Sequence, residues 1–338
     1  MLSVRSTPAQ INRAIGFIKR SLDQYAGFGD AHYYRYLCLR RINQEPGVQA
    51  RSLEAAQRYG SEALDNKRDP FTLAVPKIYD NLVTVGQKWA LVVGISRFQP
   101  EIGAPRLGCP AADADVFAKL LTDPEIGRFP KDQVFLLTDQ GATTASIKAR
   151  LNRIATRAKS EDVVVVYVSS HGSSRSDDIR QVSYIYTYDT DVTSKDQMFG
   201  TALPMVEVSG IVSTRCLAQR TVLIFDTCHS GETIAQNLSG DDVDRLREGA
   251  GRYILSSCQA NQKSYEDAEH GFFTASLVDV LRERKGCVRL NDLFRQVQSE
   301  VRAKAANMHK DQAPAIFKSE NASEIVLGAA AGASGDHC

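Results

Sequence analysis

Reactive side chains follow two apolar runs in this sequence. The stretch "TVLIFDTCHSG" leads from an apolar run into Cys228 and His229, and the stretch "VVVVYVSSHG" leads into His171 and Gly172. A free thiol is only a few per cent thiolate at neutral pH, and a nearby imidazole can turn it into a working nucleophile. If the folded chain brings the two ends together, these residue types predict acyl-transfer chemistry by a Cys–His pair.

The neighbours of the cysteine are compatible with this chemistry. Gly172 and Gly231 would let backbone N–H groups approach a substrate carbonyl closely. His229 adjoins Cys228 and is a rival base, but neighbouring side chains on an extended segment point to opposite faces, which favours His171. A lone cysteine or a lone histidine is more often a buried filler or a strand cap. The two motifs together favour a catalytic pair.

The elements that must position these residues alternate along the chain. Short runs rich in Val, Ile and Leu predict strands that are buried on both faces, and their alternation with helices predicts an α/β domain with a mostly parallel central sheet. The expected strands lie at 89–95, 133–138, 162–168, 183–189, 221–226 and 252–257, and the expected helices at about 111–122, 143–158, 205–218 and 271–284. In such sheets, binding sites form beyond the carboxyl ends of the strands, where His171 and Cys228 are expected.

Composition excludes several classes of protein. The chain has 338 residues, 43% of them apolar, and 41 basic against 40 acidic residues. It can bury a large core, and its near-neutral charge favours neither nucleic acid nor a membrane surface as a partner. No apolar run reaches the roughly 20 residues of a membrane span, and the N-terminus lacks a signal-peptide pattern. We expect a soluble, cytoplasmic protein.

The cysteines do not form a recognisable framework. The seven are widely spread and contain no C-x-x-C pair, which argues against a set of disulfides and against a zinc site. We therefore expect mostly reduced cysteines, no metal and no cofactor. Cys258 is expected to line the core, and nothing near Cys109 or Cys216 suggests reactivity.

The chain is expected to divide into three parts. Residues 1–82 carry apolar residues at helical spacing and contain no strand-like run, which predicts a helical region. It loosely resembles tetratricopeptide-type hairpins, although a helical cap on the next domain is an equal alternative. Residues 83–326 should form the α/β domain, and residues 327–338 a flexible tail.

Several motifs together resemble a known family. They include "ALVVGI", "VYVSSHG", "TYDTD", "FDTCHSG", "ILSSCQANQKSYED" and "HGFFTASLVDVL". This set is similar to the caspase-like cysteine peptidases of the metacaspase and prokaryotic-caspase group, over about Trp89 to Lys318. The sequence departs from the group where Ser170 replaces a usual glycine, and it lacks the acidic cluster that many metacaspases carry for calcium.

The resemblance implies a caspase–hemoglobinase fold and a set of catalytic roles. Cys228 would attack the scissile carbonyl to form a thioester acyl-enzyme, and His171 would protonate the leaving amine. The backbone N–H groups of Gly172 and Cys228 would hold the oxyanion. The protein would then be a cysteine endopeptidase acting on protein substrates.

The resemblance also assigns a specificity pocket. Residues two apart on a strand share a face, so Asp226 should look into the same cleft as Cys228. By resemblance, the acid at this position lines the S1 pocket and selects a basic P1 side chain, Arg and then Lys, with Asp113 as its helper. The alternative is that Asp226 caps the following turn and Asp113 caps a helix.

Residues 232–251 form a long polar segment between two expected strands. In caspase-like enzymes such a segment is the intersubunit linker, which implies self-processing after Arg245, Arg247 or Arg252. A plain mobile loop is the alternative.

The sequence leaves the regulation and the activity open at three points. The N-terminal helical region would bind a regulatory protein or hold the enzyme inactive. A caspase-like peptidase with a non-basic P1 preference is one alternative to Arg/Lys specificity. A catalytically inactive scaffold that acts through its helical region is another.

Overall fold

The computed structural model describes residues 11–12, 14–15, 18, 29–41, 46–58, 85–173, 182–227, 252–259, 262–318 and 325–329. The chain separates into two compact units, Met1–Asp80 and Asn81–Cys338, each with its own internal packing.

The first unit is helical where it is described. Helix α2 spans Gly29–Arg41 and helix α3 spans Pro46–Arg58, and the two pack against each other. Their small core contains Tyr33, Leu37 and Cys38 from α2 and Ala56 from α3. Whether this helical hairpin belongs to a tetratricopeptide-type repeat stays a prediction.

The second unit is built on a six-stranded sheet with the strand order β2-β1-β3-β6-β7-β8. The first five of these strands are parallel and β8 is antiparallel to β7. Their bounds are Lys88–Gly94 (β1), Val134–Thr138 (β2), Val163–Ser170 (β3), Arg220–Thr227 (β6), Arg252–Ser256 (β7) and Ala315–Lys318 (β8). The predicted α/β class with a mostly parallel sheet flanked by helices is confirmed.

Burial follows the position of each strand in the sheet. All eight residues of β3 and all eight of β6 are buried, whereas no residue of the edge strand β2 is fully buried. The central strands read as continuous apolar runs because helices cover both of their faces. Register places Val165 between Ala90 of β1 and Val222 of β6, so small and β-branched apolar side chains lie in one row across the middle of the sheet.

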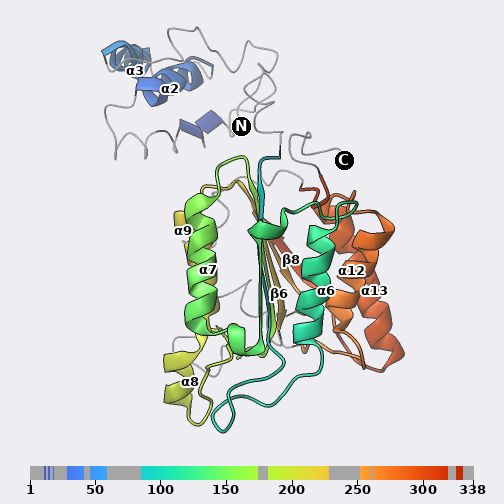
Figure 1. Ribbon diagram of the computed structural model, residues 1–338. Helices are drawn as coiled ribbons and strands as arrows, with labels where there is room; N and C mark the ends of the chain where they lie inside the picture. Colours follow the sequence, from blue (N-terminus) through green and yellow to red (C-terminus); the bar gives the residue numbers. More distant parts are fainter. Residues whose placement is uncertain are drawn as a thin grey trace. The chain divides into compact units, whose positions relative to one another are not determined.

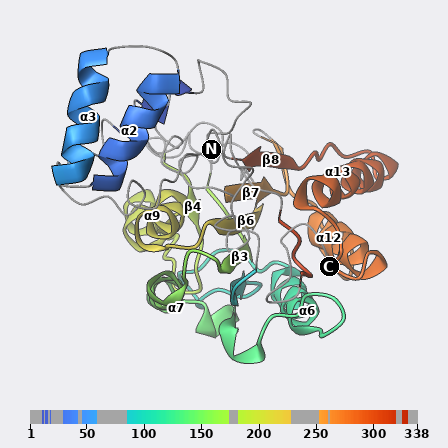
Figure 2. The ribbon, with the colours of Figure 1, turned by 90° about the horizontal axis from the view of Figure 1, so that it is seen from above.

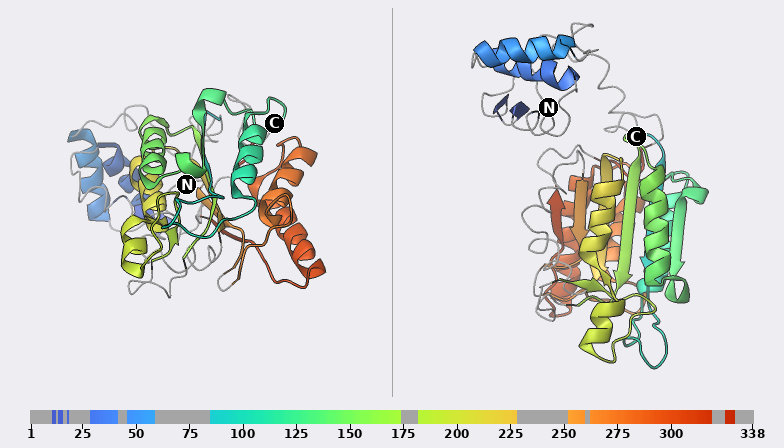
Figure 3. Two further views of the ribbon diagram at one scale, coloured as in Figure 1. Left: turned by 60° about the horizontal axis from the view of Figure 1, so that its bottom comes forward. Right: turned by 90° about the vertical axis from the view of Figure 1, so that its left-hand side faces the viewer.

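Two groups of helices cover the sheet (Figure 1). Helices α6 (Pro110–Thr122), α12 (Phe272–Glu283) and α13 (Leu290–Asn307) pack on one face, and α7 (Thr144–Arg157) and α9 (Met205–Arg215) pack on the other. Figure 2 shows the two groups on opposite sides of the strands, and the right-hand view of Figure 3 shows α7 and α9 in front of the sheet. Each face has its own apolar core.

Local sequence signals mark the start of two of these helices. Pro110 occupies the first turn of α6, where its missing N–H would have no helical partner anyway. The side chain of Thr143 caps α7 by accepting a hydrogen bond from the Ser146 N–H at 3.1 Å.

The connections create a switch point in the sheet. From β1 the chain passes through α6 to β2 on one side, and it then returns through α7 to β3 on the other side of β1. Ligand sites in open α/β sheets form at the carboxyl ends of strands beside such a point. The residues that follow β1, β3 and β6 therefore meet at one edge.

The structure differs from the predicted elements around residues 183–189. This segment contributes only a two-residue strand, β4 (Tyr184–Ile185), which pairs with β5 (Leu203–Pro204) outside the main sheet. The hydroxyl of Thr187 bonds the side chains of Asp189 and Thr190 instead, and such local bonds compete with a strand ladder. Several elements were not predicted, among them the short helix α8 (Lys195–Thr201), the long helix α13 and the strands β5 and β8.

The described end of the chain is packed into the second unit. Leu327 and Ala329 are 2% and 0% exposed, and the buried Lys88 ammonium donates to the carbonyls of Gly127 and Leu327, both at 2.7 Å. The expected start of a flexible tail at residue 327 therefore falls within packed structure.

Within the described part of the chain, no helix is long and apolar enough to cross a membrane, and no cluster of His, Cys, Asp and Glu side chains could hold a metal ion. Four of the described cysteines, Cys38, Cys109, Cys216 and Cys258, are buried thiols outside any disulfide, while Cys287 is disulfide-bonded.

Candidate active site

A cavity of about 240 Å³ opens at the carboxyl ends of the central strands. Its wall combines the residue that follows β3, the end of β6, the first turn of α6 and the segment before α12. The lining residues are Leu107, Pro110, Asp113, Ser169, Ser170, His171, Asp226, Ser264, Tyr265, Glu266 and Gly271. Three of the residues predicted from the sequence, His171, Asp113 and Asp226, thus line one cavity.

His171 is held by a backbone carbonyl. Its Nε2 lies 2.8 Å from the Pro105 carbonyl oxygen, and the rings of Phe98 and Tyr186 lie against it at centroid distances of 5.4 and 6.2 Å. A carbonyl only accepts, so Nε2 carries the proton and donates it to Pro105. In the neutral ring, Nδ1 is then the free base.

Burial keeps this ring neutral. Desolvation lowers the pKa of His171 below its ordinary value, and it outweighs the Pro105 carbonyl and the Glu266 carboxylate, which both favour the charged form. A neutral imidazole with a free Nδ1 can accept a proton from a thiol at physiological pH.

The loop that carries Pro105 is fixed at both ends. The Leu107 N–H donates to the Ser96 carbonyl at 2.9 Å, and the N–H groups of Gly108 and Cys109 donate to the two carboxylate oxygens of Glu266 at 3.0 and 3.1 Å. Glu266 therefore connects the acidic side of the cavity to the loop that orients His171.

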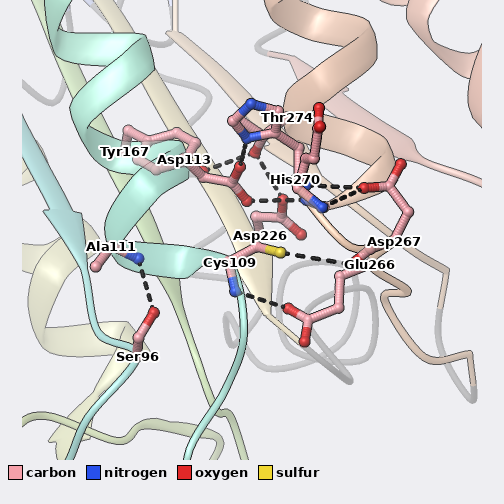
Figure 4. A network of polar contacts seen from close by, with 12 residues as sticks. Ser96, Cys109, Ala111, Asp113, Tyr167, Asp226, Glu266, Asp267, His270 and Thr274 are labelled. Atoms are coloured by element: carbon pink, nitrogen blue, oxygen red, sulfur yellow. Dashed lines mark hydrogen bonds and ion pairs between the residues drawn. The ribbon is translucent and has the colours of Figure 1, made fainter.

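Asp226 is buried at the end of β6 and receives two hydroxyl donors. Ser264 and Thr274 each donate to one of its carboxylate oxygens at 2.7 Å. The Thr274 hydroxyl has one proton, so the Tyr167 hydroxyl, 2.7 Å away, must donate to Thr274 in turn. This relay, drawn in Figure 4, fixes the orientation of Asp226.

Asp113 lies opposite Asp226, in the first turn of α6, and is 1% exposed. Its Oδ1 is 2.7 Å from the Nδ1 of His270, and its Oδ2 accepts the Gly271 N–H at 3.1 Å. A Cβ atom on Gly271 would lie 3.1 Å from Asp113 Oδ2 and 3.2 Å from Asp226 Oδ2, so the two carboxylates approach the same point. A side chain at position 271 would therefore crowd both carboxylate oxygens.

Two buried carboxylates at one point are electrostatically unfavourable without a cation. Burial, and then the charge of Asp226, raise the pKa of Asp113 to about 7, although the bonds from Gly271 and His270 oppose the change. Burial also raises the pKa of Asp226, against the bonds from its hydroxyl donors. A guanidinium or ammonium group in the cavity would relieve this repulsion.

Sequence reasoning missed Glu266, Ser264 and His270. Glu266 adds a third carboxylate to the cavity wall, and Ser264 and His270 bond the two aspartates. All three lie in the loop between β7 and α12, which carries no strand or helix pattern. The order of acidic and polar residues in "SYEDAEHG" gives no signal of which ones face inward.

The residues at the end of β3 are suited to a site that binds the backbone of another peptide. Gly172 and Ile185 form an isolated antiparallel bridge. Its two hydrogen bonds run from the Ser173 N–H to the Tyr184 carbonyl and from the Tyr186 N–H to the His171 carbonyl. The bridge therefore does not use the Gly172 N–H. Ser170 donates its hydroxyl hydrogen to the Tyr186 carbonyl at 2.6 Å and so anchors the neighbouring segment.

The remaining predicted residues are distributed unevenly. Cys228, Gly231, Arg245 and Arg247 lie outside the described residues, as does the rival base His229. Arg252 is the first residue of β7, in register with Thr221 of β6.

The fold and the site define the class of protein. A mixed sheet covered by helices on both faces, with a histidine after one central strand and an acidic cavity beside it, is the arrangement expected of a caspase-like peptidase domain. The family model for the caspase domain matches residues 87–325, and the chain belongs to this family. Its second unit is thus a caspase domain, a family of cysteine peptidases.

Comparison with a solved caspase structure agrees with this fold. Caspase-1 from Spodoptera frugiperda is 16% identical, with a TM-score of 0.53 over 73% of this chain and 92% of that chain. A second similar structure, protein GSU0716 from Geobacter sulfurreducens, is 20% identical, with a TM-score of 0.48 over 68% of this chain and 92% of that chain. No curated protein matches the chain significantly.

Proposed function

We propose that this protein is a cysteine endopeptidase that cleaves protein substrates after arginine and, less efficiently, after lysine. One observation carries the proposal: the cavity beside His171 is lined by three carboxylates, Asp113, Asp226 and Glu266, two of them buried. A buried anionic pocket next to a catalytic base selects a cationic side chain at the residue whose carbonyl is attacked.

The catalytic pair in this proposal is Cys228 and His171. Ser170 of β3 and Thr227 of β6 are partners in the parallel ladder, and His171 and Cys228 each follow by one residue. One peptide link spans about 3.8 Å between Cα atoms, and paired strands lie about 4.8 Å apart. Chain connectivity therefore supports a short distance between the two residues.

In the proposed reaction His171 acts through Nδ1. It takes the thiol proton of Cys228, and the thiolate attacks the scissile carbonyl while the Gly172 and Cys228 N–H groups stabilise the oxyanion. The protonated ring then donates to the leaving amine, which leaves a thioester. Attack of water on the thioester releases the second product and restores the thiol. Throughout, the Pro105 carbonyl keeps the Nε2 proton in place and the ring oriented.

The proposed pocket predicts an order of preference among P1 side chains. A guanidinium can make two parallel hydrogen bonds with a carboxylate, whereas an ammonium makes a point contact, so arginine should be preferred over lysine. An aspartate at P1 would add a further negative charge, with repulsion of about 1–4 kcal/mol at about 4 Å. Cleavage after aspartate should be negligible.

The test varies the P1 residue alone. We expect kcat/KM on a fluorogenic peptide series to fall in the order Arg, Lys, citrulline, Asp for the wild type. Asp226→Ala should lose Arg and Lys turnover while Cys228 still reacts with a small alkylating agent, because the pocket and not the nucleophile is damaged. Efficient cleavage after Asp or a large apolar residue by the wild type would contradict the assigned pocket.

We further propose that residues 232–251 are a processing linker and that the helical first unit binds a regulatory protein. The linker proposal is supported by its place between β6 and β7, where a cut leaves the sheet's hydrogen bonds intact. The partner proposal is supported by the separate core of the first unit.

A further inference from the structure

A histidine behind the acidic cavity contacts one of its carboxylates. His270 does not belong to the residues that line the cavity, yet its Nδ1 is 2.7 Å from Asp113 Oδ1. The Asp113 side chain is 1% exposed and the His270 side chain is 32% exposed. The ring thus links a fully buried carboxylate to the solvent side of the site (Figure 4).

The backbone around His270 holds the ring in this place. The N–H groups of Glu269 and His270 both donate to the Asp267 side chain, at 2.8 and 2.9 Å, and the Asp267 N–H donates back to the His270 carbonyl at 3.0 Å. The next residue, Gly271, supplies the second donor to Asp113. One short turn therefore delivers two donors to the two oxygens of the same carboxylate.

The two aspartates differ in what keeps them charged. Asp226 accepts hydrogen bonds from two hydroxyls, whereas one of the two donors to Asp113 is an imidazole ring. Among the described residues, the other charged and titratable groups around the pair offer Asp113 no positive charge. They are Asp226 from β6, Tyr167 from β3, Cys109 before α6, and Glu266 and Asp267 from the loop before α12. His171, which follows β3 and lines the same cavity, has a pKa lowered by burial and is neutral.

We propose that His270 is a positioning residue for substrate specificity, which donates its Nδ1 proton to Asp113 and so favours the ionised form of this carboxylate and orients it for a cationic P1 side chain. The inference rests on the proposed cleavage after basic residues and adds the group that sets the charge of the pocket. Without this donor, burial and Asp226 drive Asp113 to take up a proton, because they already raise its pKa to about 7 with the donor present. When Asp113 is protonated, the buried pair of aspartates carries only half of its full negative charge.

A permanently charged His270 would have the opposite effect. It would neutralise Asp113 and weaken the attraction for arginine, so its removal would then strengthen the preference for arginine. The direction of the change in a variant therefore distinguishes the two roles.

The experiment compares P1 arginine with P1 citrulline, its neutral isostere, in otherwise identical peptides. The ratio of the two kcat/KM values cancels everything that the substrates share, including the titration of His171 and Cys228. We expect His270→Ala to lower this ratio by about tenfold at pH 7, mainly through KM for the arginine peptide, with citrulline turnover within about twofold of wild type. The pH at which the ratio reaches half its maximum should rise by about one unit.

Two variants control for structure. His270→Asn keeps an N–H near the position of Nδ1 and should restore most of the ratio. Glu269→Ala is a substitution in the same turn. Glu269 bonds Asp267 through its backbone N–H and not through its side chain, so this variant should leave the ratio unchanged.

The possible outcomes test the role of His270 and the proposed P1 specificity separately. An unchanged or larger ratio in His270→Ala overturns the role of His270, and so does an equal loss for both peptides. A wild-type enzyme with no preference for arginine over citrulline overturns the proposed P1 specificity itself. Preference in the wild type with no loss in the variant overturns only the inference about His270.

Discussion

At the scale of single residues, the expected catalytic unit is Cys228 with His171. We expect Cys228→Ala and His171→Ala each to lower kcat/KM by about a thousandfold or more without loss of folding, because members of one catalytic unit fail together. His229→Ala should have a far smaller effect. The measurement is turnover of an arginine peptide together with a thermal unfolding curve for each variant. A His171→Ala enzyme that retains a tenth of wild-type kcat/KM would exclude the pair.

At the scale of elements, the connection between β6 and β7 is the expected processing site. The purified wild type should yield two fragments with a new N-terminus after Arg245 or Arg247, while Cys228→Ala stays whole. The fragments should remain associated, because β6 and β7 pair in register from Thr221–Arg252 to Phe225–Ser256. Cleavage after Arg252 would require the first residue of β7 to leave the sheet, so it should be slower. Mass spectrometry and gel filtration test both points, and an active enzyme that stays a single chain would contradict processing.

At the scale of the whole molecule, the acidic pocket should reduce stability. The pKa of Asp113 rises from 3.8 in its ordinary state to about 7 in the folded protein. Between pH 4 and 7 the folded state then binds a proton that the unfolded state has released, so the free energy of unfolding falls as pH rises through this window. The amide of an Asp113→Asn variant does not titrate in this range. We expect the stability of this variant relative to wild type to increase from pH 4 to pH 7 by on the order of 2–4 kcal/mol, and to level off above pH 8.

This difference is measured by urea unfolding at several pH values. The hydrogen bond that asparagine loses changes the difference in the free energy of unfolding by an amount that does not depend on pH. The titration of His171 contributes equally to both proteins and so cancels from the difference. A difference that does not change with pH would show that Asp113 is already ionised at pH 4. It would also remove the electrostatic reason for a cation in the pocket.

Local patterns in the sequence were enough to predict the fold class, the mostly parallel sheet and the positions of the reactive strand ends. Continuous runs of Val, Ile and Leu indicate strands that are buried on both faces. Each run is a local feature of the sequence and can be recognised without knowing the tertiary structure. The motifs around His171 and Asp226 could be located for a related reason, since residues that follow parallel strands share one edge of a sheet. The strand expected at 183–189 is only the two-residue β4. The helix α13 and the antiparallel β8 were not predicted, although the apolar residues of α13 recur at helical spacing.

The surroundings of the two aspartates, in contrast, depend on tertiary packing. Asp113 lies 113 residues before Asp226 in the chain, and their meeting point at Gly271 is set by the packing of α6 and α12 on the same face of the sheet. The bonds from Ser264, His270 and Thr274, and the link from Glu266 to the Pro105 loop, join segments up to 158 residues apart. No local pattern encodes such contacts, because each depends on how a loop without regular structure is placed by the elements on either side. The charge of the pocket therefore follows from burial, which the order of the residues alone does not reveal.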